Sequence, residues 1–281
     1  MAKLLLSAFT DEYADSLAEQ IEGMKRFSLG YTELRFVDKL NVSQCSLSQG
    51  KELQSRLQAE GLRVSAIGSP LGKIPLDSDR SAHRETAKRI FELAALLETE
   101  YVRVFSFYAP HDKAVTLCKN QVVDALGELI ELARPYGLTL CHENEAKIYG
   151  DLPHRCRELL DVFGGELKCV FDMGNFVLEG QDPYPEAYEL LKEYIAYFHI
   201  KDALFEGAIV PPGKGNAKIR EILTAHKAYA KKDFFVSLEP HLQTFSGRNA
   251  LVGRAFDNPY KFPDQKSAFA AAVQCFREGM E

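Results

Sequence analysis

Short apolar runs recur along the chain, and each is followed by a segment with helical periodicity. The first run covers residues 4–8, and the segment after it places Leu17, Ile21, Met24 and Phe27 on one helical face. The same alternation predicts eight strands, at residues 4–8, 31–36, 62–68, 101–107, 138–143, 167–172, 195–200 and 234–239. It predicts further helices at residues 50–61, 83–97, 118–136, 152–163, 185–194, 219–229 and 266–279.

Several of these strands are almost continuously apolar, which is typical of a parallel sheet covered by helices. Eight strand-and-helix units with no linker between them predict a single α/β domain over residues 1–281, folded as a (β/α)8 TIM barrel. The main alternative, a doubly wound open sheet, usually carries a glycine-rich phosphate turn after an early strand. Residues 7–12 form no such turn, and Thr10, Asp11 and Glu12 are interpreted as the start of a helix.

Four consecutive predicted strands end on an acidic or imidazole side chain: Glu143, Asp172, His199 and Glu239. In a barrel the carboxyl ends of the strands converge on one mouth, so these side chains are expected to meet there. Three carboxylates and one imidazole suit one Mn²⁺, Mg²⁺, Co²⁺ or Zn²⁺ ion, and the missing thiolates argue against a structural zinc site. Any one of them alone is explained equally well as a helix cap or an ion-pair partner. Four at the same end of consecutive strands favour a metal centre.

Polar side chains near these positions are candidates for contact with a polyol or sugar. Lys201 is suited to polarising a carbonyl or holding an oxyanion, and an ion pair with Asp202 is the equal alternative. Charged side chains inside strands are costly unless they are paired or functional, which singles out the pair on one face of residues 31–36, Glu33 and Arg35. The substrate-binding candidates are Asn144, Asn175, Lys201, Glu33 and Arg103.

Two histidines beside the candidate ligands are expected to differ in role. His142 alternates with Glu143 and should point away from the mouth into the helix layer, whereas His241 follows Glu239 closely enough to reach the site. Arg248 and Arg254, in a long segment without clear periodicity, are candidates for contact with a phosphate or carboxylate.

Composition narrows the class of protein. A net charge of -6 argues against non-specific nucleic-acid binding, which needs clustered Lys and Arg. The six cysteines form no CxxC motif and are expected to be buried free thiols. No apolar stretch approaches the roughly 20 residues of a membrane helix, and the amino terminus does not fit a signal peptide. We therefore expect a cytoplasmic protein without membrane contact, and the sequence leaves its association into homo-oligomers open.

The strand-end motifs resemble those of the xylose-isomerase-like TIM-barrel superfamily of sugar (phosphate) isomerases and epimerases. The resemblance extends from residue 7 to about residue 242 and is carried by the order and spacing of short motifs. These motifs are Glu143-Asn144, Asp172-Met173-Gly174-Asn175, His199-Ile200-Lys201-Asp202, Gly213-Lys214-Gly215 and Leu238-Glu239.

The resemblance implies one divalent metal ion held by Glu143, Asp172, His199 and Glu239. In the epimerase branch of the superfamily, the glutamates corresponding to Glu143 and Glu239 also form the acid/base pair. One removes a proton next to a carbonyl and the other returns a proton to the opposite face, while the metal stabilises the enediolate. The expected activity is therefore that of a metal-dependent sugar or sugar-phosphate isomerase or epimerase.

The chain also departs from the tagatose-type epimerases. Asn175 stands where those enzymes usually have a histidine, and no arginine follows His199 within a few residues. Both positions help to hold substrate in those enzymes. The alternatives are a lyase of the inosose-dehydratase type acting on a keto-polyol, an endonuclease-IV-like DNA-repair enzyme, and a barrel that binds a sugar without catalysis.

Overall fold

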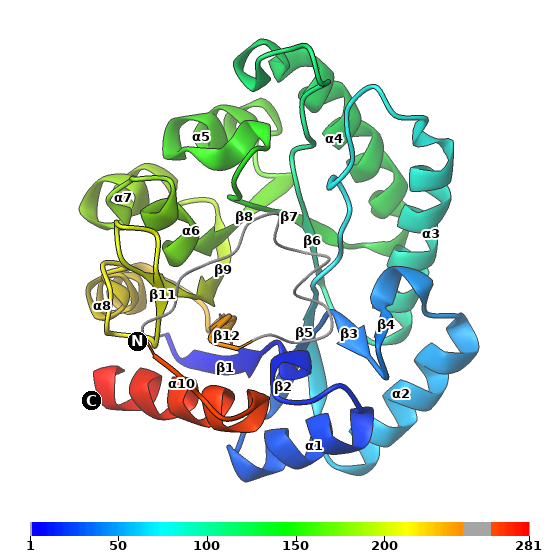
Figure 1. The fold of residues 1–281 in the computed structure, drawn as a ribbon. Helices are drawn as coiled ribbons and strands as arrows, with labels where there is room; N and C mark the ends of the chain where they lie inside the picture. Colours follow the sequence, from blue (N-terminus) through cyan, green and yellow to red (C-terminus); the bar gives the residue numbers. More distant parts are fainter. Residues whose placement is uncertain (1, 244–259, 281) are drawn as a thin grey trace.

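Eight strands form one parallel sheet around a central axis, with helices on the outside, in a computed structural model that describes residues 2–243 and 260–280 (Figure 1). The strands are β1 (Leu4–Ala8), β2 (Tyr31–Leu34), β5 (Arg63–Ile67), β6 (Tyr101–Val104), β7 (Thr139–Glu143), β8 (Leu167–Asp172), β9 (Ile195–Ile200) and β12 (Phe234–Leu238). Each lies within the range expected from its apolar run, so the TIM-barrel prediction is confirmed. That the domain covers all of residues 1–281 stays a prediction.

Two threonines close the barrel at the one pair of strands that lacks a backbone ladder. The sheet runs in the order β1-β12-β9-β8-β7-β6-β5-β2, which leaves β1 and β2 as its two edges. The hydroxyl of Thr32 on β2 donates to the carbonyl of Ala8 on β1 at 3.2 Å. It also lies 2.9 Å from the hydroxyl of Thr10. These side-chain bonds hold the edges side by side and protect them from pairing elsewhere.

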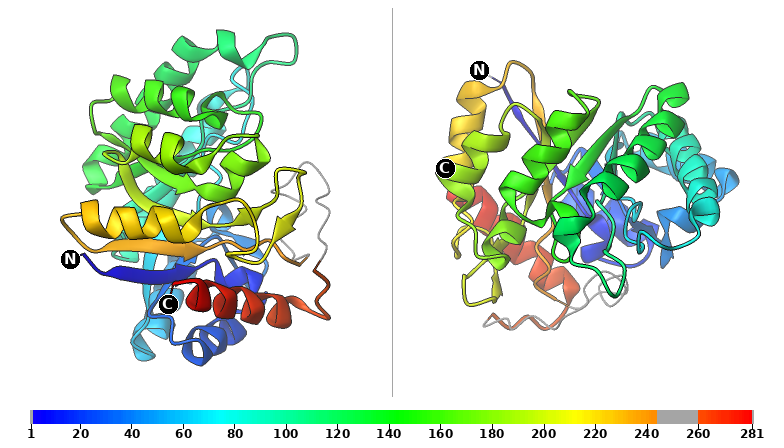
Figure 2. Two further views of the ribbon diagram at one scale, coloured as in Figure 1. Left: turned by 90° about the vertical axis from the view of Figure 1, so that its left-hand side faces the viewer. Right: turned by 90° about the horizontal axis from the view of Figure 1, so that it is seen from above.

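Most helices lie where the periodicity predicts them. They are α1 (Leu17–Arg26), α2 (Leu47–Ala59), α3 (Arg80–Leu96), α4 (Lys119–Ala133), α5 (Pro153–Val162), α8 (Ile219–Tyr229) and α10 (Gln265–Met280). Figure 2 shows α10 lying along the outside of β1, where Phe269 packs against Tyr13 with ring centroids 5.7 Å apart. Among the described residues, no helix combines the length and the apolar character needed to cross a membrane.

Some short elements were not expected. The first predicted helix start was wrong: Thr10–Glu12 is a 3-10 turn, and α1 begins after Ser16, whose hydroxyl accepts from the backbone N–H of Glu19. The predicted helix at 185–194 is a π-helical turn, Pro183–Ala187, followed by α7 (Tyr188–Leu191). The additional elements include α6 (Met173–Leu178) and two small hairpins, β3 (Phe36–Val37) with β4 (Leu40–Asn41) and β10 (Asp202–Ala203) with β11 (Ile209–Val210). Short 3-10 helices lie at Val42–Gln44, Val115–Leu117, Arg134–Tyr136 and Tyr149–Asp151.

The inside of the barrel changes from aromatic to charged towards the carboxyl ends of the strands. Near the amino ends, Tyr101 and Tyr197 pack with their ring centroids 5.8 Å apart. Above them the hydroxyls of Ser7 and Ser65 lie 2.7 Å apart. Because side chains alternate along a strand, the next inward position on β9 after Tyr197 is His199, which belongs to a layer of charged residues. The strands therefore position a buried charged layer at the carboxyl end.

Candidate metal centre

The four candidate ligands come together at the carboxyl end of the barrel. Glu143, Asp172 and His199 lie at the ends of β7, β8 and β9, and Glu239 follows β12. All four are buried, and one ligand atom from each lies within 4.8 Å of the others. Because β12, β9, β8 and β7 are consecutive in the sheet, the two glutamates stand at the ends of the row, with His199 and Asp172 between them.

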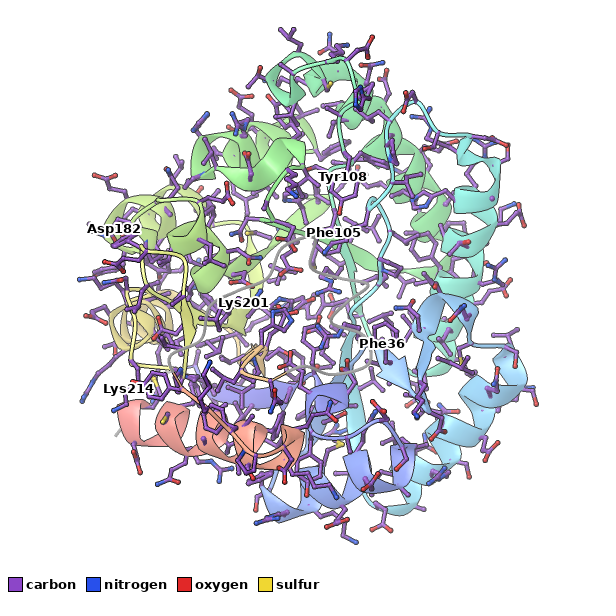
Figure 3. All side chains as sticks on the ribbon, viewed as in Figure 1. Phe36, Phe105, Tyr108, Asp182, Lys201 and Lys214 are labelled. Carbon is purple, nitrogen blue, oxygen red and sulfur yellow. The ribbon has the colours of Figure 1, made fainter. Side chains whose placement is uncertain are left out.

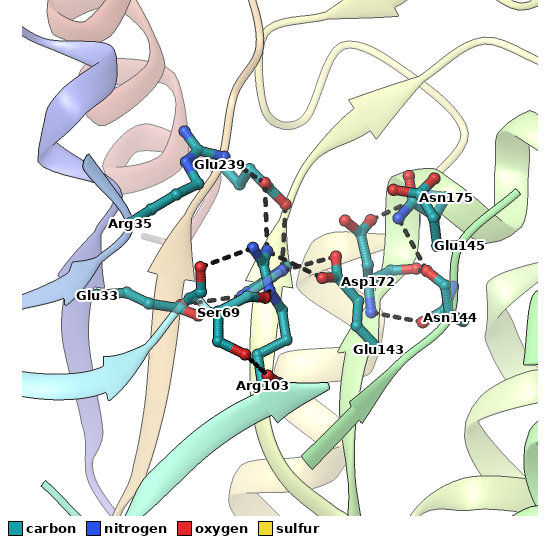
Figure 4. A network of polar contacts seen from close by, with 12 residues as sticks. Glu33, Arg35, Ser69, Arg103, Glu143, Asn144, Glu145, Asp172, Asn175 and Glu239 are labelled. Atoms are coloured by element: carbon teal, nitrogen blue, oxygen red, sulfur yellow. Dashed lines mark hydrogen bonds and ion pairs between the residues drawn. The ribbon is translucent and has the colours of Figure 1, made fainter. Parts of the chain in front are cut away.

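His199 lies at the centre of the contacts within this cluster (Figure 4 shows the surrounding network). Its Nδ1 is 2.9 Å from Oε1 of Glu143 and 3.1 Å from Oε2 of Glu239. Its Nε2 is 2.9 Å from Oε2 of Glu33 on β2. Burial disfavours a charged imidazole, but the carboxylates of Glu33 and Glu143 outweigh burial and raise the pKa of His199 well above its usual value.

Each of the two glutamates is also held by an arginine from a strand that lies beyond its end of the ligand row. Arg103 of β6 donates from Nη1 to Oε2 of Glu143 at 3.0 Å. Arg35, directly after β2, donates from Nη1 to Oε1 of Glu239 at 2.8 Å. Figure 4 shows both guanidinium groups reaching towards the row of ligands. Each glutamate is thereby oriented with one oxygen towards an arginine and the other towards His199.

The donor set and the local charge fit a divalent cation. The connected network of buried side chains contains six carboxyl groups and three permanent cations, so the carboxyl groups outnumber the cations by three. Burial raises the pKa of Glu12 to about 8 and that of Asp172 to about 7, so a divalent ion beside them would favour their ionised forms. Oxygen and imidazole donors without thiolate are the set expected for Mn²⁺, Mg²⁺, Co²⁺ or Zn²⁺. The carboxylates are Asp11, Glu12, Glu33, Glu143, Asp172 and Glu239, and the cations are Arg35, Arg103 and Lys201.

The carboxylates of this network differ in their acidity. Burial raises the pKa of Glu143, but His199 and Arg103 outweigh burial and lower it to about 2. For Glu239, Lys201 and His199 outweigh burial in the same way, and its pKa lies well below the usual value. For Asp172 burial dominates over Lys201 and raises the pKa to about 7. The two glutamates are thus the groups kept ionised by their neighbours.

The model of the xylose isomerase-like TIM barrel family matches residues 19–256. The chain belongs to this family. A search of curated proteins found no match.

Solved structures of xylose isomerase-like barrels superpose over nearly the whole chain, at low sequence identity. A D-allulose 3-epimerase from Methylomonas sp. gives a TM-score of 0.74 at 15% identity, with 99% of this chain and 100% of that chain covered. The probable 3-DHS dehydratase AsbF of petrobactin synthesis, from Bacillus anthracis, gives 0.72 at 18% identity, with 99% of both chains covered. The IolI protein with a bound zinc atom gives 0.71 at 19% identity, with 99% of this chain and 98% of that chain covered. These likenesses establish the fold that the chain shares with them.

Asn144 and Asn175, two predicted substrate contacts, anchor the backbone around Asp172. The side-chain amide of Asn144 donates to the carbonyl of Asp172 and accepts from its N–H, both at 3.0 Å. The amide of Asn175 donates to the carbonyl of Asn144 at 2.9 Å. Asp172 is also the N-cap of α6, since its Oδ1 accepts from the N–H of Asn175 at 2.8 Å. Asp172 is therefore a helix cap as well as a candidate ligand, and the roles of Asp172 as a ligand and of the asparagines as substrate contacts stay predictions.

Lys201 lies inside the ring of strands, among the ligands, while Lys214 lies at the periphery (Figure 3). Its ammonium group donates to Oδ2 of Asp172 at 2.8 Å, to Oδ1 of Asn175 at 3.1 Å and to Oε2 of Glu239 at 3.3 Å. Gly174 makes room for it, because a Cβ there would lie 2.7 Å from Cγ of Lys201. The glycine of the Asp172–Asn175 motif is thus explained by the approach of this lysine.

Asp202 has a structural task that accounts for the Gly213-Lys214-Gly215 motif. Its carboxylate accepts backbone N–H groups from Gly213 at 2.8 Å, Gly215 at 2.9 Å and Ala217 at 3.0 Å. A Cβ on Gly215 would lie 2.3 Å from Oδ1 of Asp202, so this position requires glycine. The alternative of an ion pair between Lys201 and Asp202 therefore has no support from these contacts.

Three acidic residues take part in the network in ways that the sequence did not reveal. Arg35 donates from Nε to Oδ2 of Asp11 at 3.0 Å and from Nη2 to Oε1 of Glu12 at 3.2 Å. Oε2 of Glu33 lies 2.9 Å from Nε2 of His199, and Oε1 accepts from the hydroxyl of Tyr197. Asp11 and Glu12 were interpreted as residues of a helix start, and their sequence positions give no sign of Arg35. The sequence singled out Glu33 and Arg35 only because a charged side chain within a buried strand is energetically unfavourable unless it is paired or functional.

The histidines beside the ligands separate as expected. Nε2 of His142 lies 2.9 Å from the hydroxyl of Ser106, away from the four ligands. Nε2 of His241 lies 3.5 Å from Oε1 of Glu239 and 3.5 Å from Oε1 of Glu12. His241 thus adjoins the ligand row, as Glu12, Glu239 and His241 form a smaller cluster of their own. Arg248 and Arg254 lie outside the described residues.

Proposed function

We propose that this chain is a divalent-metal-dependent sugar or sugar-phosphate isomerase or epimerase. The observation that carries the proposal is the row of Glu239, His199, Asp172 and Glu143 on four consecutive strands at one mouth. A divalent ion held by these four side chains would polarise the carbonyl of a hydroxy-carbonyl substrate and make the neighbouring C–H acidic. The proposed substrate is a small sugar or sugar phosphate.

Glu143 and Glu239 are the proposed proton-transfer pair. One carboxylate takes the proton from the carbon next to the carbonyl, and the other, after taking up a proton from solvent, donates it to the product carbon. Their places at the two ends of the ligand row allow approach from two sides of the substrate. A carboxylate with a pKa of about 2, as for Glu143, is a weak base. The proposal therefore requires a strongly acidified C–H.

Lys201 is the proposed group that balances negative charge on the substrate oxygen. Its ammonium is buried between Asp172 and Glu239, so it lies beside the carboxylates that would bind the ion. A buried ammonium stabilises a developing oxyanion more strongly than one in water. Asn144, Asn175 and Arg103 complete the proposed substrate surroundings, mainly by fixing the groups that contact it.

Two of the structural neighbours support this class of chemistry. One is a sugar epimerase, D-allulose 3-epimerase, and another, IolI, carries zinc. Their identities to this chain are 15% and 19%, so they support the reaction class rather than a particular sugar.

Solvent-deuterium incorporation tests the proposal. The purified chain, with Mn²⁺ supplied, is incubated in D2O with a panel of ketoses, aldoses and their phosphates. We expect one substrate to gain a carbon-bound deuteron next to its carbonyl, and Glu143→Gln and Glu239→Gln to reduce the rate by about 10²–10⁴-fold. Turnover without any deuterium at carbon, or full exchange in both variants, would contradict the proposed pair.

A keto-polyol dehydratase is the second candidate. It uses the same proton abstraction but then expels a neighbouring hydroxyl, which needs a proton donor close to the ligands. Lys201 is placed to supply it, and the likeness to a probable 3-DHS dehydratase is of the same quality as that to the epimerase. A product lighter by one water in the mass spectrum would identify this reaction, whereas an isomerase leaves the mass unchanged.

The two remaining alternatives have less support. A net charge of -6 disfavours an enzyme that must hold a DNA backbone. A barrel that only binds sugar would show binding without deuterium exchange in the same experiment. The cytoplasmic location and the state of association stay predictions.

A further inference from the structure

Glu33 contacts the candidate ligand His199 from the far side of the barrel. Oε2 of Glu33 lies 2.9 Å from Nε2 of His199, and Oε1 accepts from the hydroxyl of Tyr197 at 3.0 Å. Glu33 is on β2 and His199 on β9, which are not neighbours in the sheet, so the contact crosses the barrel interior. The side chain of Glu33 has 0% exposure, and each of its two oxygens contacts one of these two side chains.

This contact decides which nitrogen of His199 faces the other ligands. A carboxylate oxygen accepts hydrogen bonds, so the contact with Oε2 of Glu33 favours a proton on Nε2 of His199. Nδ1 is then the nitrogen available as a ligand, and it lies between Oε1 of Glu143 and Oε2 of Glu239, at 2.9 and 3.1 Å. With the opposite tautomer, a proton would occupy the nitrogen that faces the carboxylates.

The aromatic neighbours of His199 restrict the orientation of its ring. Phe9 meets the imidazole edge-on with centroids 5.2 Å apart, and Tyr197 does so at 5.5 Å. Tyr197 precedes His199 by two residues on β9, so both side chains point inward. Tyr197 thus restricts the ring by packing and holds Glu33 by its hydroxyl.

We propose that Glu33 is a positioning residue of the metal centre, which fixes His199 with its proton on Nε2 and strengthens Nδ1 as a ligand. The inference rests on the proposed function, because it requires a metal ion at the four-residue site. A carboxylate behind a ligating imidazole fixes the tautomer and raises the basicity of the ligand nitrogen. This role replaces substrate contact as the explanation of a charged side chain within β2.

Glu33→Gln separates charge from shape. The glutamine has the same size and its amide oxygen still accepts a hydrogen bond, but the negative charge is lost. Tyr197→Phe is the matched control, because it removes the bond to Oε1 of Glu33 and leaves the bond to His199. Co²⁺ is the probe, with binding followed by its visible absorption spectrum and by competition with a chelator. Urea unfolding of the metal-free proteins verifies that both variants fold.

We expect Glu33→Gln to weaken Co²⁺ binding by about 10–100-fold and to change the absorption spectrum. Tyr197→Phe should weaken binding by a smaller factor. Glu33→Gln with the affinity and spectrum of the wild type would overturn the proposal. If the wild type itself bound no Co²⁺, the proposed function would fail first, so the two failures are distinguishable.

A second measurement needs no variant of Glu33. In the zinc-loaded wild type, long-range ¹H–¹⁵N spectra report which ring nitrogen of each histidine carries a proton, and His199→Asn identifies the signal. We expect His199 to be protonated at Nε2 and unprotonated at Nδ1. A proton on Nδ1 with zinc on Nε2 would overturn the proposal even if Glu33→Gln failed to fold.

Discussion

The two halves of the barrel mouth hold their charged side chains differently. The half formed by β7, β8, β9 and β12 presents one candidate ligand per strand and is called the ligand half. The other half, which also carries Asp11, Glu12 and Glu33, is called the cationic half because it stacks cations on aromatic rings. Cζ of Arg35 lies 4.0 Å from the ring centroid of Phe9, and Cζ of Arg103 lies 5.1 Å from the same centroid. Arg103 also lies 4.9 Å from the ring of Phe105, and Nζ of Lys73 lies 4.2 Å from it.

The difference shows that the ligand half depends on the cationic half. Arg35 and Arg103 each donate to one of the two glutamates, so a side chain from the cationic half fixes one oxygen of each. Arg103, together with His199, also lowers the pKa of Glu143, and an ionised carboxylate is a better metal ligand than a protonated one. The four candidate ligand residues are therefore only part of the candidate metal centre.

The largest effect on stability is expected from removing the charge of Arg35, which pairs with three carboxyl groups. Arg35→Met leaves Asp11, Glu12 and Glu239 without their shared guanidinium. Removing one partner of a buried ion pair costs about 3–5 kcal/mol, because the charge of the other partner stays buried without compensation. We expect the free energy of unfolding, measured in urea at pH 7 without metal, to fall by this amount.

Arg134→Met is the matched control for Arg35→Met. Arg134 also pairs with two carboxylates, Glu131 and Glu166, but all three side chains are more than half exposed. Exposed pairs contribute about 0–1 kcal/mol. If Arg35→Met and Arg134→Met lowered the free energy of unfolding equally, the ligand half would not depend on buried cations as proposed.

An intermediate effect is expected from pH, through His199. The surrounding carboxylates raise its pKa well above the usual value, so a metal ion must displace a proton at neutral pH. Affinity for Co²⁺ should therefore rise with pH, by about tenfold per unit while the imidazole is protonated. Binding isotherms between pH 6 and 8 measure the slope. A flat profile would mean that His199 is neutral in the metal-free chain.

The smallest effect on stability is expected from Lys73, the partly exposed cation of the cationic half. Nζ of Lys73 lies 3.0 Å from Glu145, and both side chains are partly exposed, at 12% and 25%. Lys73→Met should lower the free energy of unfolding by about 1 kcal/mol at low salt. High salt should reduce the difference in the free energy of unfolding between Lys73→Met and the wild type. If Lys73→Met lowered the free energy of unfolding as much as Arg35→Met, the greater burial of Arg35 would not explain the difference expected between the two residues.

The strands could be predicted closely because each apolar run ends abruptly on polar residues. β1, β8 and β9 have the predicted bounds. The helix α6 was missed because its six residues are mostly buried apolar ones that follow β8 directly, with no periodicity to separate strand from helix. The hairpins were missed because their strands are two residues long.

The ligand row could be predicted because its residues share one position, the end of a strand. The partners of Glu33 and Arg35 could not, because they are set by closure of the barrel. Glu33 and His199 are 166 residues apart, and Arg35 and Glu239 are 204 apart. No local pattern encodes such pairs. The sequence could show only that a charge within a strand needs a partner, without naming the partner.

Metal analysis of the purified chain tests the central claim most directly. After growth in medium with Mn²⁺, Co²⁺ and Zn²⁺ and dialysis against metal-free buffer, the wild type should retain one divalent ion per chain. Glu239→Gln should retain far less, because it removes an anionic ligand from the row. The absence of a stoichiometric divalent ion in the wild type, or equal retention by Glu239→Gln, would contradict the account.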